Sequence, residues 1–455
     1  MNGARLARSK RMNAMADVKV IRTAAETGLA HAYAQARDRL PGDDAIAAQR
    51  AAAFDLFARE GLPHRRVEEW KYTDLRVLMR EAKPLAGPPD AAAKARAKSA
   101  GAILGDVECR RLVFVDGAFV PELSDTAALE PGLRVTSLAA ALADADPTLV
   151  DKIGRLAPAN DVAVALNTAL MGDGAVIRIG AGATIERPLH LVFVAGDKPV
   201  ATFMRSLVVA EEGARAMLVE SHEGLAGNDY QVNAALELFV GDEAHVDYVK
   251  IIGEGAEALH ISTLAAAIGG RARFNAFTFT TGGAVVRNQL FLRFDGEGTV
   301  AGIRGATLIK GRQHADTTLV ASHIARGCQS RELFKAALDG EAHGVFQGRI
   351  IVRPGAQQTD AKMMTQALLL SERAEADNKP ELEIFADDVQ CGHGATAGAL
   401  DPELKFYLIA RGIPAAEAEA LLIQAFLGEA VEGIEHAGLR EALMEEVAAW
   451  LGARG

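Results

Sequence analysis

The 455-residue chain is acidic, with 49 lysines and arginines against 60 aspartates and glutamates and a formal net charge of −11. This charge argues against general nucleic-acid binding, which favours basic protein surfaces. The three cysteines are far apart and form no Cys-x-x-Cys pair, which argues against a disulfide framework and fits a reducing compartment. No stretch reaches the roughly 18 apolar residues of a membrane span. We therefore expect a cytoplasmic protein that binds neither nucleic acid nor membrane.

The first residues carry several positive charges between Arg5 and Arg11 and precede the first acid, Asp17. They lack the apolar run of a secretory signal. An arginine-rich targeting segment is one interpretation. A disordered extension, or a true start at Met12 or Met15, is the interpretation that we favour.

Residues 17–102 read as helical, and residues 1–106 are expected to form an N-terminal extension and helical domain. The strings AHAYAQARDRL and DAIAAQRAAAFDLFAREG are rich in alanine and place apolar residues three and four apart. Gly61 and Pro63 then mark a helix stop. The segment Glu68–Thr73 (EEWKYT) predicts a helix cap with a half-buried aromatic pair, and AGPPDAAAKARAKSAG, residues 86–101, predicts a mobile linker.

The texture of the sequence changes at Arg111. LVFVDGAFV indicates two short strands across an Asp-Gly turn. An alanine-rich helical insert is expected near residues 137–171. From Ala175 onward, short apolar segments such as AVIRIG, LHLVFVAG and SLVVAEEG alternate with glycine turns for almost two hundred residues.

The glycines of this region recur at a fixed period. One series is spaced 28 or 29 residues apart and a second is spaced 29 apart, about half a period out of step; the positions are Gly213, Gly241, Gly269, Gly298, Gly327 and Gly355, then Gly224, Gly253, Gly282, Gly311 and Gly340. A period of 20 to 50 residues is typical of stacked repeats. Two turns in each period predict coils whose strands stack on those of the coil below.

We therefore predict a mainly β protein with a right-handed parallel β-helix, or solenoid, as its core. The core is expected over residues 107–398, with helical segments at both ends. A β-sandwich also contains many short strands, but it has no reason to keep one period.

Residues 399–455 are expected to form a C-terminal helical domain. Asp401 and Pro402 can cap and open a helix, Pro414 opens a second one, and residues 440–451 suggest a third. Apolar side chains follow one stripe of the second helix. The stripe could pack against the solenoid or receive a partner protein; the partner-binding candidates are Phe406, Tyr407, Leu408, Leu421, Leu422 and Phe426.

A thiol and an imidazole lie close together near the end of the predicted solenoid. Cys391 and His393 are two residues apart, so on a strand they project to the same face. Both groups are ligands for iron, zinc and copper, and the glycines beside them leave room for another surface. Alternatively, the pair is a buried cysteine and a hydrogen-bonded histidine with no metal. No four-thiolate site is possible within this chain, since it has three cysteines.

A known family carries the same residues. ADDVQCGHGATAG, with QALLLSERAEADNKPELEIFADD before it and FYLIARGI after it, resembles the SufB/SufD family of iron–sulfur cluster assembly proteins. The Cys-Gly-His-Gly-Ala-Thr form is similar to the SufD branch, because SufB members typically have Glu-His-Glu-Ala at this place. The resemblance extends from about Phe294 to Glu429, and EEWKYT matches a short family signature upstream.

The resemblance implies a non-catalytic scaffold subunit of a SUF-type assembly complex. It implies a SufB-like partner, a SufC-type ABC ATPase and a transient iron–sulfur cluster at the joint between subunits, with His393 and, less directly, Cys391 as metal ligands shared with the partner. A homodimer is expected when the partner is missing. The resemblance also implies strands over residues 361–378 (AKMMTQALLLSERAEADN), where propensity alone favours helix.

The remaining motifs suggest little chemistry. No G-x-x-x-x-G-K-[ST] is present, so no nucleotide site is expected in this chain. Glu220–Glu223 (ESHE) and His314-x-Asp316 are interpreted as polar surface at turns. The alternative function is a carbohydrate-active β-helix enzyme, a lyase or glycoside hydrolase, which would be a secreted chain with a row of acidic or basic residues along one face.

Overall fold

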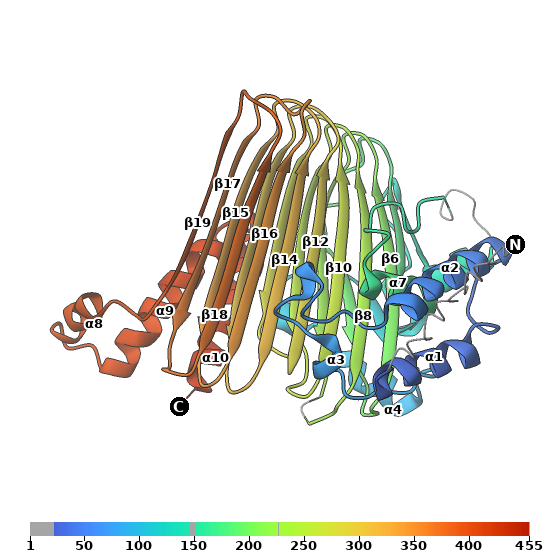
Figure 1. Cartoon of the computed structure of the whole chain (residues 1–455), viewed down its shortest axis with the longest axis horizontal. Helices are drawn as coiled ribbons and strands as arrows, with labels where there is room; N and C mark the ends of the chain where they lie inside the picture. The colour runs from blue at the N-terminus through green and yellow to red at the C-terminus, as the bar shows by residue number, and fades with distance from the viewer. Residues whose placement is uncertain (1–21, 145–150, 226, 455) are drawn as a thin grey trace, which may run out of the picture.

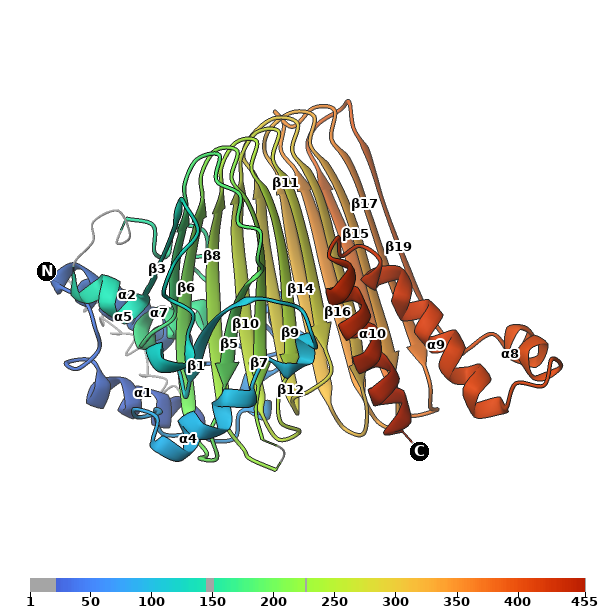
Figure 2. The same cartoon turned by 180° about the vertical axis from the view of Figure 1, so that it is seen from behind.

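Two long sheets of mostly parallel strands face each other along the whole molecule (Figure 1). The computed structural model describes residues 22–144, 151–225 and 227–454. The expectations about the N-terminal extension, including a start at Met12 or Met15, lie outside these residues. The described part of the chain confirms the prediction of a mainly β, parallel solenoid with helices at both ends (Figure 2).

Successive coils contribute their strands alternately to the two sheets. The nine-stranded sheet, called here the even sheet, contains β3 (Leu133–Ser137), β4 (Ala175–Ile179), β6 (Ala201–Ala210), β8 (Gln231–Val240), β10 (Leu259–Ile268), β12 (Val285–Phe294), β14 (His314–His323), β16 (His343–Val352) and β18 (Glu375–Ile384). The ten-stranded odd sheet contains β1 (Arg110–Val115), β2 (Ala118–Phe119), β5 (Leu189–Val194), β7 (Arg215–Glu223), β9 (His245–Gly253), β11 (Arg273–Thr280), β13 (Val300–Ile309), β15 (Gln329–Leu338), β17 (Asp360–Leu369) and β19 (Gln390–Gly398).

The register of the strands explains the glycine period. Val285 pairs with His314, and His314 pairs with His343, so one coil takes 29 residues here. Gly311 and Gly340 lie one coil apart in equivalent turns, with φ angles of +66° and +69°. A side chain is strained in this left-handed conformation, so the turn selects glycine in each coil.

Alternate residues of each strand point into and out of the solenoid. On β9, Val246 and Tyr248 face the core between the sheets, whereas Val249 and Ile251 face outward and are covered by helices. Both faces of a parallel sheet are usually covered in this way. The inward residues of successive coils stack into one continuous apolar core.

The N-terminal helices cover the outer face of the even sheet (Figure 1). Leu29, Phe57 and Trp70 pack there on Leu259 and Ile261 of β10. The elements are α1 (Ala24–Ala36), α2 (Asp44–Glu60), the 3-10 turn η1 (Glu68–Trp70) and α3 (Leu75–Leu78), together with α7 (Val162–Leu170) from the predicted insert, which also contains α5 (Leu138–Ala143).

The predicted mobile linker at residues 86–101 is wrong. Part of it forms helix α4 (Ala91–Arg96), followed by a 3-10 turn (Ala97–Ser99). Ala93 and Ala97 are buried against Val113 and Val192 on the outer face of β1 and β5. The alanines that suggested a plain linker are small enough to let this helix lie directly on the sheet.

The C-terminal helices are α8 (Pro402–Ile409), α9 (Ala415–Val431) and α10 (Ala437–Gly452). Figure 2 shows α9 and α10 across the outer face of the odd sheet and α8 projecting away from it. The stripe of α9 that contacts the sheet differs from the expected one, because Ile423 and Leu427 are buried there, while Leu421 is exposed. Residues 361–378 are strands, as the family resemblance implied, since hydrogen bonds from neighbouring coils outweigh helix propensity.

Candidate functional site

Strand β19 ends the solenoid and carries the predicted ligand pair. Cys391 pairs in register with Ala361, and His393 with Met363. Ala361 and Met363 are both buried in the core between the sheets. Because register partners in a sheet project to the same side, the thiol and the imidazole share the core-facing side of the last strand.

No further coil covers this end of the core within the described part of the chain. The last strands, β18 and β19, each pair with a single neighbour, so each leaves one edge with free backbone groups. Beside them Ile384 and Phe385 are 42% and 56% exposed. Exposed strand edges with apolar neighbours favour pairing with another chain.

The two candidate ligands differ in their surroundings. Cys391 is half-buried and packs against the end of the core, and burial raises the pKa of its thiol above the usual value. The thiol is therefore protonated at neutral pH and must lose its proton before it binds metal. His393 is exposed and has no hydrogen-bond partner among the described residues. Its imidazole is free to bind a metal ion without first losing a proton.

A groove of about 600 Å³ runs along the opposite face of the same strands. Exposed Lys362 and Met364 alternate with inward Met363, so the groove lies on the outer face of the odd sheet. Gly392 and Gly394 line it without side chains, which agrees with the expectation that another surface can approach there. Its lining comprises Arg304, Arg331, Glu332, Leu333, Lys362, Met363, Met364, Gln390, Cys391, Gly392, His393 and Gly394.

Glu332 is a candidate that the sequence analysis missed. It lies on the core-facing side of β15, between Ile303 and Met363 in register, and is 2% exposed. Neither carboxyl oxygen has a hydrogen-bond partner among the described residues. Burial raises the pKa of Glu332 to about 7, and the Ser330 hydroxyl, engaged with His323 at 3.0 Å, offsets this only in part. An acidic residue in phase with inward-facing Phe334 could have given it away.

The other cysteines and histidines of the C-terminal coils do not join the pair. His323 stacks on Phe294 in the core, and Cys328 is fully buried. His343 donates or accepts hydrogen bonds at 2.7 Å with Asp377 and at 3.2 Å with His314 on the outer face of the even sheet. These side chains have structural partners of their own.

The interpretation of Glu220–Glu223 as surface at a turn is wrong. Glu220 and His222 lie on strand β7 and are 3% and 1% exposed. Both point into the core, where Glu220 Oε1 is 3.0 Å from Lys250 Nζ and 2.6 Å from His222 Nε2. Lys250 is the largest influence that lowers the pKa of Glu220, and it acts against desolvation, which raises it. Burial demands partners for these charges, and the stacking of coils supplies them.

The second such interpretation, for His314-x-Asp316, is also wrong. Both residues are buried on β14, facing the N-terminal helices. Asp316 forms an ion pair with Arg287 and accepts a hydrogen bond from the Thr73 hydroxyl at 2.5 Å. Arg287 also stacks over the Trp70 ring, 4.5 Å from its centroid. The EEWKYT segment is thus fastened to the even sheet, and Trp70 is fully buried instead of half-buried.

Helix α8 exposes much of its apolar surface. None of its residues is buried, and Phe406 and Tyr407 are 71% and 53% exposed. Of the other partner-binding candidates, Leu408 and Leu422 are half-buried, Leu421 is exposed, and Phe426 packs partly against the chain's own cluster beneath α9. The largest free apolar surface is therefore on α8.

Comparison with known families decides the relationship. Residues 193–426 match the core domain of the SufBD proteins of the SUF system for iron–sulfur cluster assembly, and residues 23–191 match the SufBD N-terminal region. The chain belongs to the SufBD family. This membership confirms the resemblance and favours iron–sulfur cluster assembly over the carbohydrate-active alternative.

Similar SufBD proteins cover most of the chain. An iron–sulfur cluster assembly SufBD family protein of Synechocystis is 33% identical over 417 residues, 89% of this chain and 90% of the relative. The iron–sulfur cluster assembly protein SufD of Escherichia coli is 31% identical over 86% of this chain and 89% of its own length. SufD of Bacillus subtilis is 28% identical over 62% of this chain and 65% of its own length. Among the described residues, no helix is long and apolar enough to cross a bilayer.

Proposed function

We propose that this chain is a non-catalytic scaffold subunit on which an iron–sulfur cluster is assembled together with a second solenoid subunit. The observation that carries the proposal is the open end of the solenoid. There a thiol and a free imidazole share one face of the last strand, beside two unpaired sheet edges. One thiolate and one imidazole are too few to hold a cluster, so the remaining ligands come from the subunit that covers this end.

The covering subunit is a SufB-like protein in this proposal. Its strands would continue the sheets beyond β18 and β19, and the cluster would lie at the joint as a transient cargo. The exposed His393 imidazole would bind iron first. Cys391, held as a thiol by its burial, would follow once the metal displaces its proton. When the partner is missing, the same edges would pair with a second copy of this chain.

The energy for the process would come from a SufC-type ATPase that docks on helix α8. Phe406 and Tyr407 offer it an apolar surface that the solenoid leaves uncovered. Deletion of residues 402–455 is a poor test of this contact, because α9 and α10 cover apolar side chains of the odd sheet. Point substitutions on α8 change the contact alone.

The deciding experiment compares His393→Ala and Cys391→Ala in complexes purified from the native cell with their partners. Both variants should assemble, since neither removes much buried apolar surface. After anaerobic reconstitution, we expect His393→Ala to retain much less iron and sulfide than the parent, with a smaller loss for Cys391→Ala. An intact His393→Ala complex that loads a cluster as well as the parent would show that the histidine is structural.

The same purification tests the partners. Mass spectrometry of the purified complex should find a SufB-like subunit and a SufC-type ATPase. The isolated chain should sediment as a dimer at micromolar concentration, and a strict monomer would contradict pairing through the open end.

A further inference from the structure

A second group of metal-ligating side chains lies on the outer face of the odd sheet, far along the solenoid from Cys391. His245 and Asp247 lie two residues apart on β9 and point to the same side, since Val246 and Tyr248 between and beside them face the core. Asn275 on β11 is the register partner of Asp247. Two neighbouring strands thus form a small polar platform.

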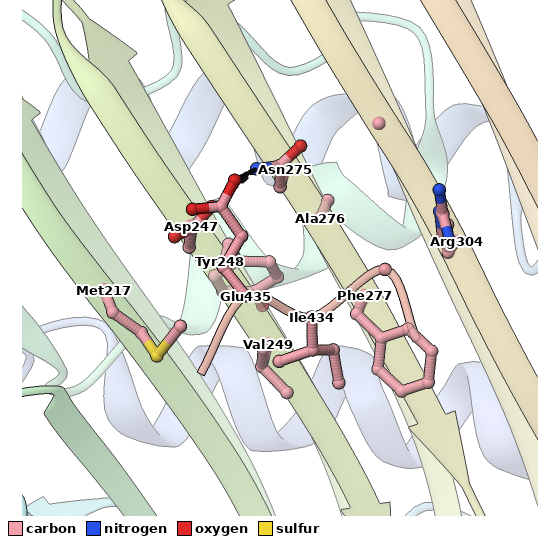
Figure 3. A pocket seen from close by; sticks show the side chains of 12 residues that line it. Met217, Asp247, Tyr248, Val249, Asn275, Ala276, Phe277, Arg304, Ile434 and Glu435 are labelled. Atoms are coloured by element: carbon pink, nitrogen blue, oxygen red, sulfur yellow. Dashed lines mark hydrogen bonds between the residues drawn. The ribbon is translucent and has the colours of Figure 1, made fainter. Parts of the chain in front are cut away.

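The connection between α9 and α10 brings a third ligand onto this platform. Ile434 is 4% exposed and anchors the connection in the apolar cluster beneath the helices, which leaves the next residue, Glu435, facing the strands. Figure 3 shows the side chains of Asp247, Asn275 and Glu435 converging. A cavity of about 40 Å³ adjoins them, which exceeds the roughly 10–15 Å³ that one water requires.

The distances suit one small cation. His245 Nε2 is 3.5 Å from Asp247 Oδ1 and 3.9 Å from Glu435 Oε2. The candidate ligand atoms of the three residues all lie within 4.8 Å of one another. Metal–ligand bonds to nitrogen and oxygen are about 2.1 Å long, which places neighbouring ligands roughly 3–3.5 Å apart. Small side-chain movements therefore bring all three onto one ion.

The charges also call for a cation. Asp247 and Glu435 approach each other, yet among the described residues neither carboxylate forms an ion pair with a lysine or arginine. Arg304 lines the same cavity but lies apart from both carboxylates (Figure 3). Arg440 donates to the backbone carbonyls of Ile434 and Glu435. His245 Nε2 is buried and has no hydrogen-bond partner in the described chain.

We propose that His245, Asp247 and Glu435 bind one divalent transition-metal cation, which clamps the α9–α10 connection to the solenoid. One imidazole and two carboxylates suit zinc, manganese or ferrous iron better than magnesium or calcium, because the latter two prefer ligand sets of oxygen alone. The Asn275 amide donates to Asp247 at 2.8 Å and orients that carboxylate. The cation would fasten the helices that carry α8 to the middle of the solenoid.

The test uses the full chain without an affinity tag, after treatment with a chelator. The background carries Cys391→Ser and His393→Ala, so that the end of the solenoid contributes no metal binding. Cobalt(II), a spectroscopic probe, is titrated while visible absorption is recorded, and zinc is then added in competition. Hydrogen exchange of residues 431–440 is measured with and without metal.

We expect one equivalent of cobalt to bind, zinc to displace it, and exchange of residues 431–440 to slow. Glu435→Gln should weaken binding by more than about tenfold, and His245→Ala should do the same. Glu432→Gln is the matched control: it removes the same charge from an exposed residue three positions away and should bind like the parent. Circular dichroism checks that each variant is folded.

Two results would overturn the proposal. One is the lack of saturable cobalt or zinc binding by the parent chain. The other is binding by folded Glu435→Gln and His245→Ala that equals that of Glu432→Gln.

Discussion

Glu332 lies in the same register row as His393, two strands deeper in the solenoid, with Met363 between them. The row places a buried carboxyl directly inward of the proposed ligand pair. The charge of Glu332 contributes to raising the pKa of the Cys391 thiol. The end of the core thus combines an exposed imidazole, a half-buried thiol and a fully buried carboxyl, each with a different readiness to ionise.

The buried carboxyl predicts a distinctive pH dependence of stability. The pKa of Glu332 is raised from 4.5 to about 7 in the folded chain, so the folded state holds this proton more tightly than the unfolded state. The resulting stabilisation is complete below about pH 4.5 and is lost as the pH rises through 7. Glu332→Gln removes the ionisation. Its free energy of unfolding, relative to that of the parent, should rise by about 3 kcal/mol between pH 4 and pH 8.

Urea unfolding of both proteins at several pH values measures this difference. Other titrating groups affect the two proteins equally and cancel. A difference that stays constant from pH 4 to pH 8 would mean that Glu332 is already ionised in the folded chain.

The Cys391 thiol should react slowly with alkylating agents. Because its pKa is raised by burial and by nearby Glu332, little thiolate is present at pH 7.5. We expect iodoacetamide to modify Cys391 more slowly in the folded chain than in urea, with peptide mapping to separate it from Cys109 and Cys328. Glu332→Gln should speed the reaction above pH 7. A folded-state rate equal to that in urea would contradict the raised pKa.

The Arg287–Asp316 ion pair should matter greatly for stability. Both side chains are fully buried, so Asp316→Asn leaves the Arg287 charge without its partner. We expect a loss of about 3–5 kcal/mol in the free energy of unfolding and faster proteolysis near Trp70. Asp295→Asn is the control: its pair with Arg293 is largely exposed and should cost less than about 1 kcal/mol. Equal effects of the two substitutions would refute the importance of burial.

Helix α8 offers a direct test of ATPase docking. Phe406 is 71% exposed, so Phe406→Glu should change the free energy of unfolding by less than about 0.5 kcal/mol. It should nevertheless weaken capture of the ATPase by tenfold or more in a quantitative pull-down. Val77→Glu, at a 67% exposed position on α3, serves as the matched control. ATPase capture that is as strong with Phe406→Glu as with Val77→Glu would place the contact elsewhere.

The repeated architecture could be predicted from the sequence because it rests on local regularity. The glycine period reports one turn per half-coil, and turns such as that at Gly311 require glycine in each coil. The strand that carries Cys391 and His393 could also be predicted, since glycines and alternation are visible within a few residues. Helices α1, α2, α8 and α9 follow from caps and alanine-rich strings for the same reason.

What the sequence by itself could not determine depends on which coils stack and which face each strand turns inward. Glu220 and His222 were expected at the surface, but stacking with β9 supplies Lys250 as a buried partner. Glu332 is recognisable only when the register places it inward of His393. Asp247 and Glu435 are 188 residues apart and meet because α9 packs on the odd sheet. Local propensity decided the elements of this protein, whereas contacts between distant coils and helices decided where its charges and ligands gather.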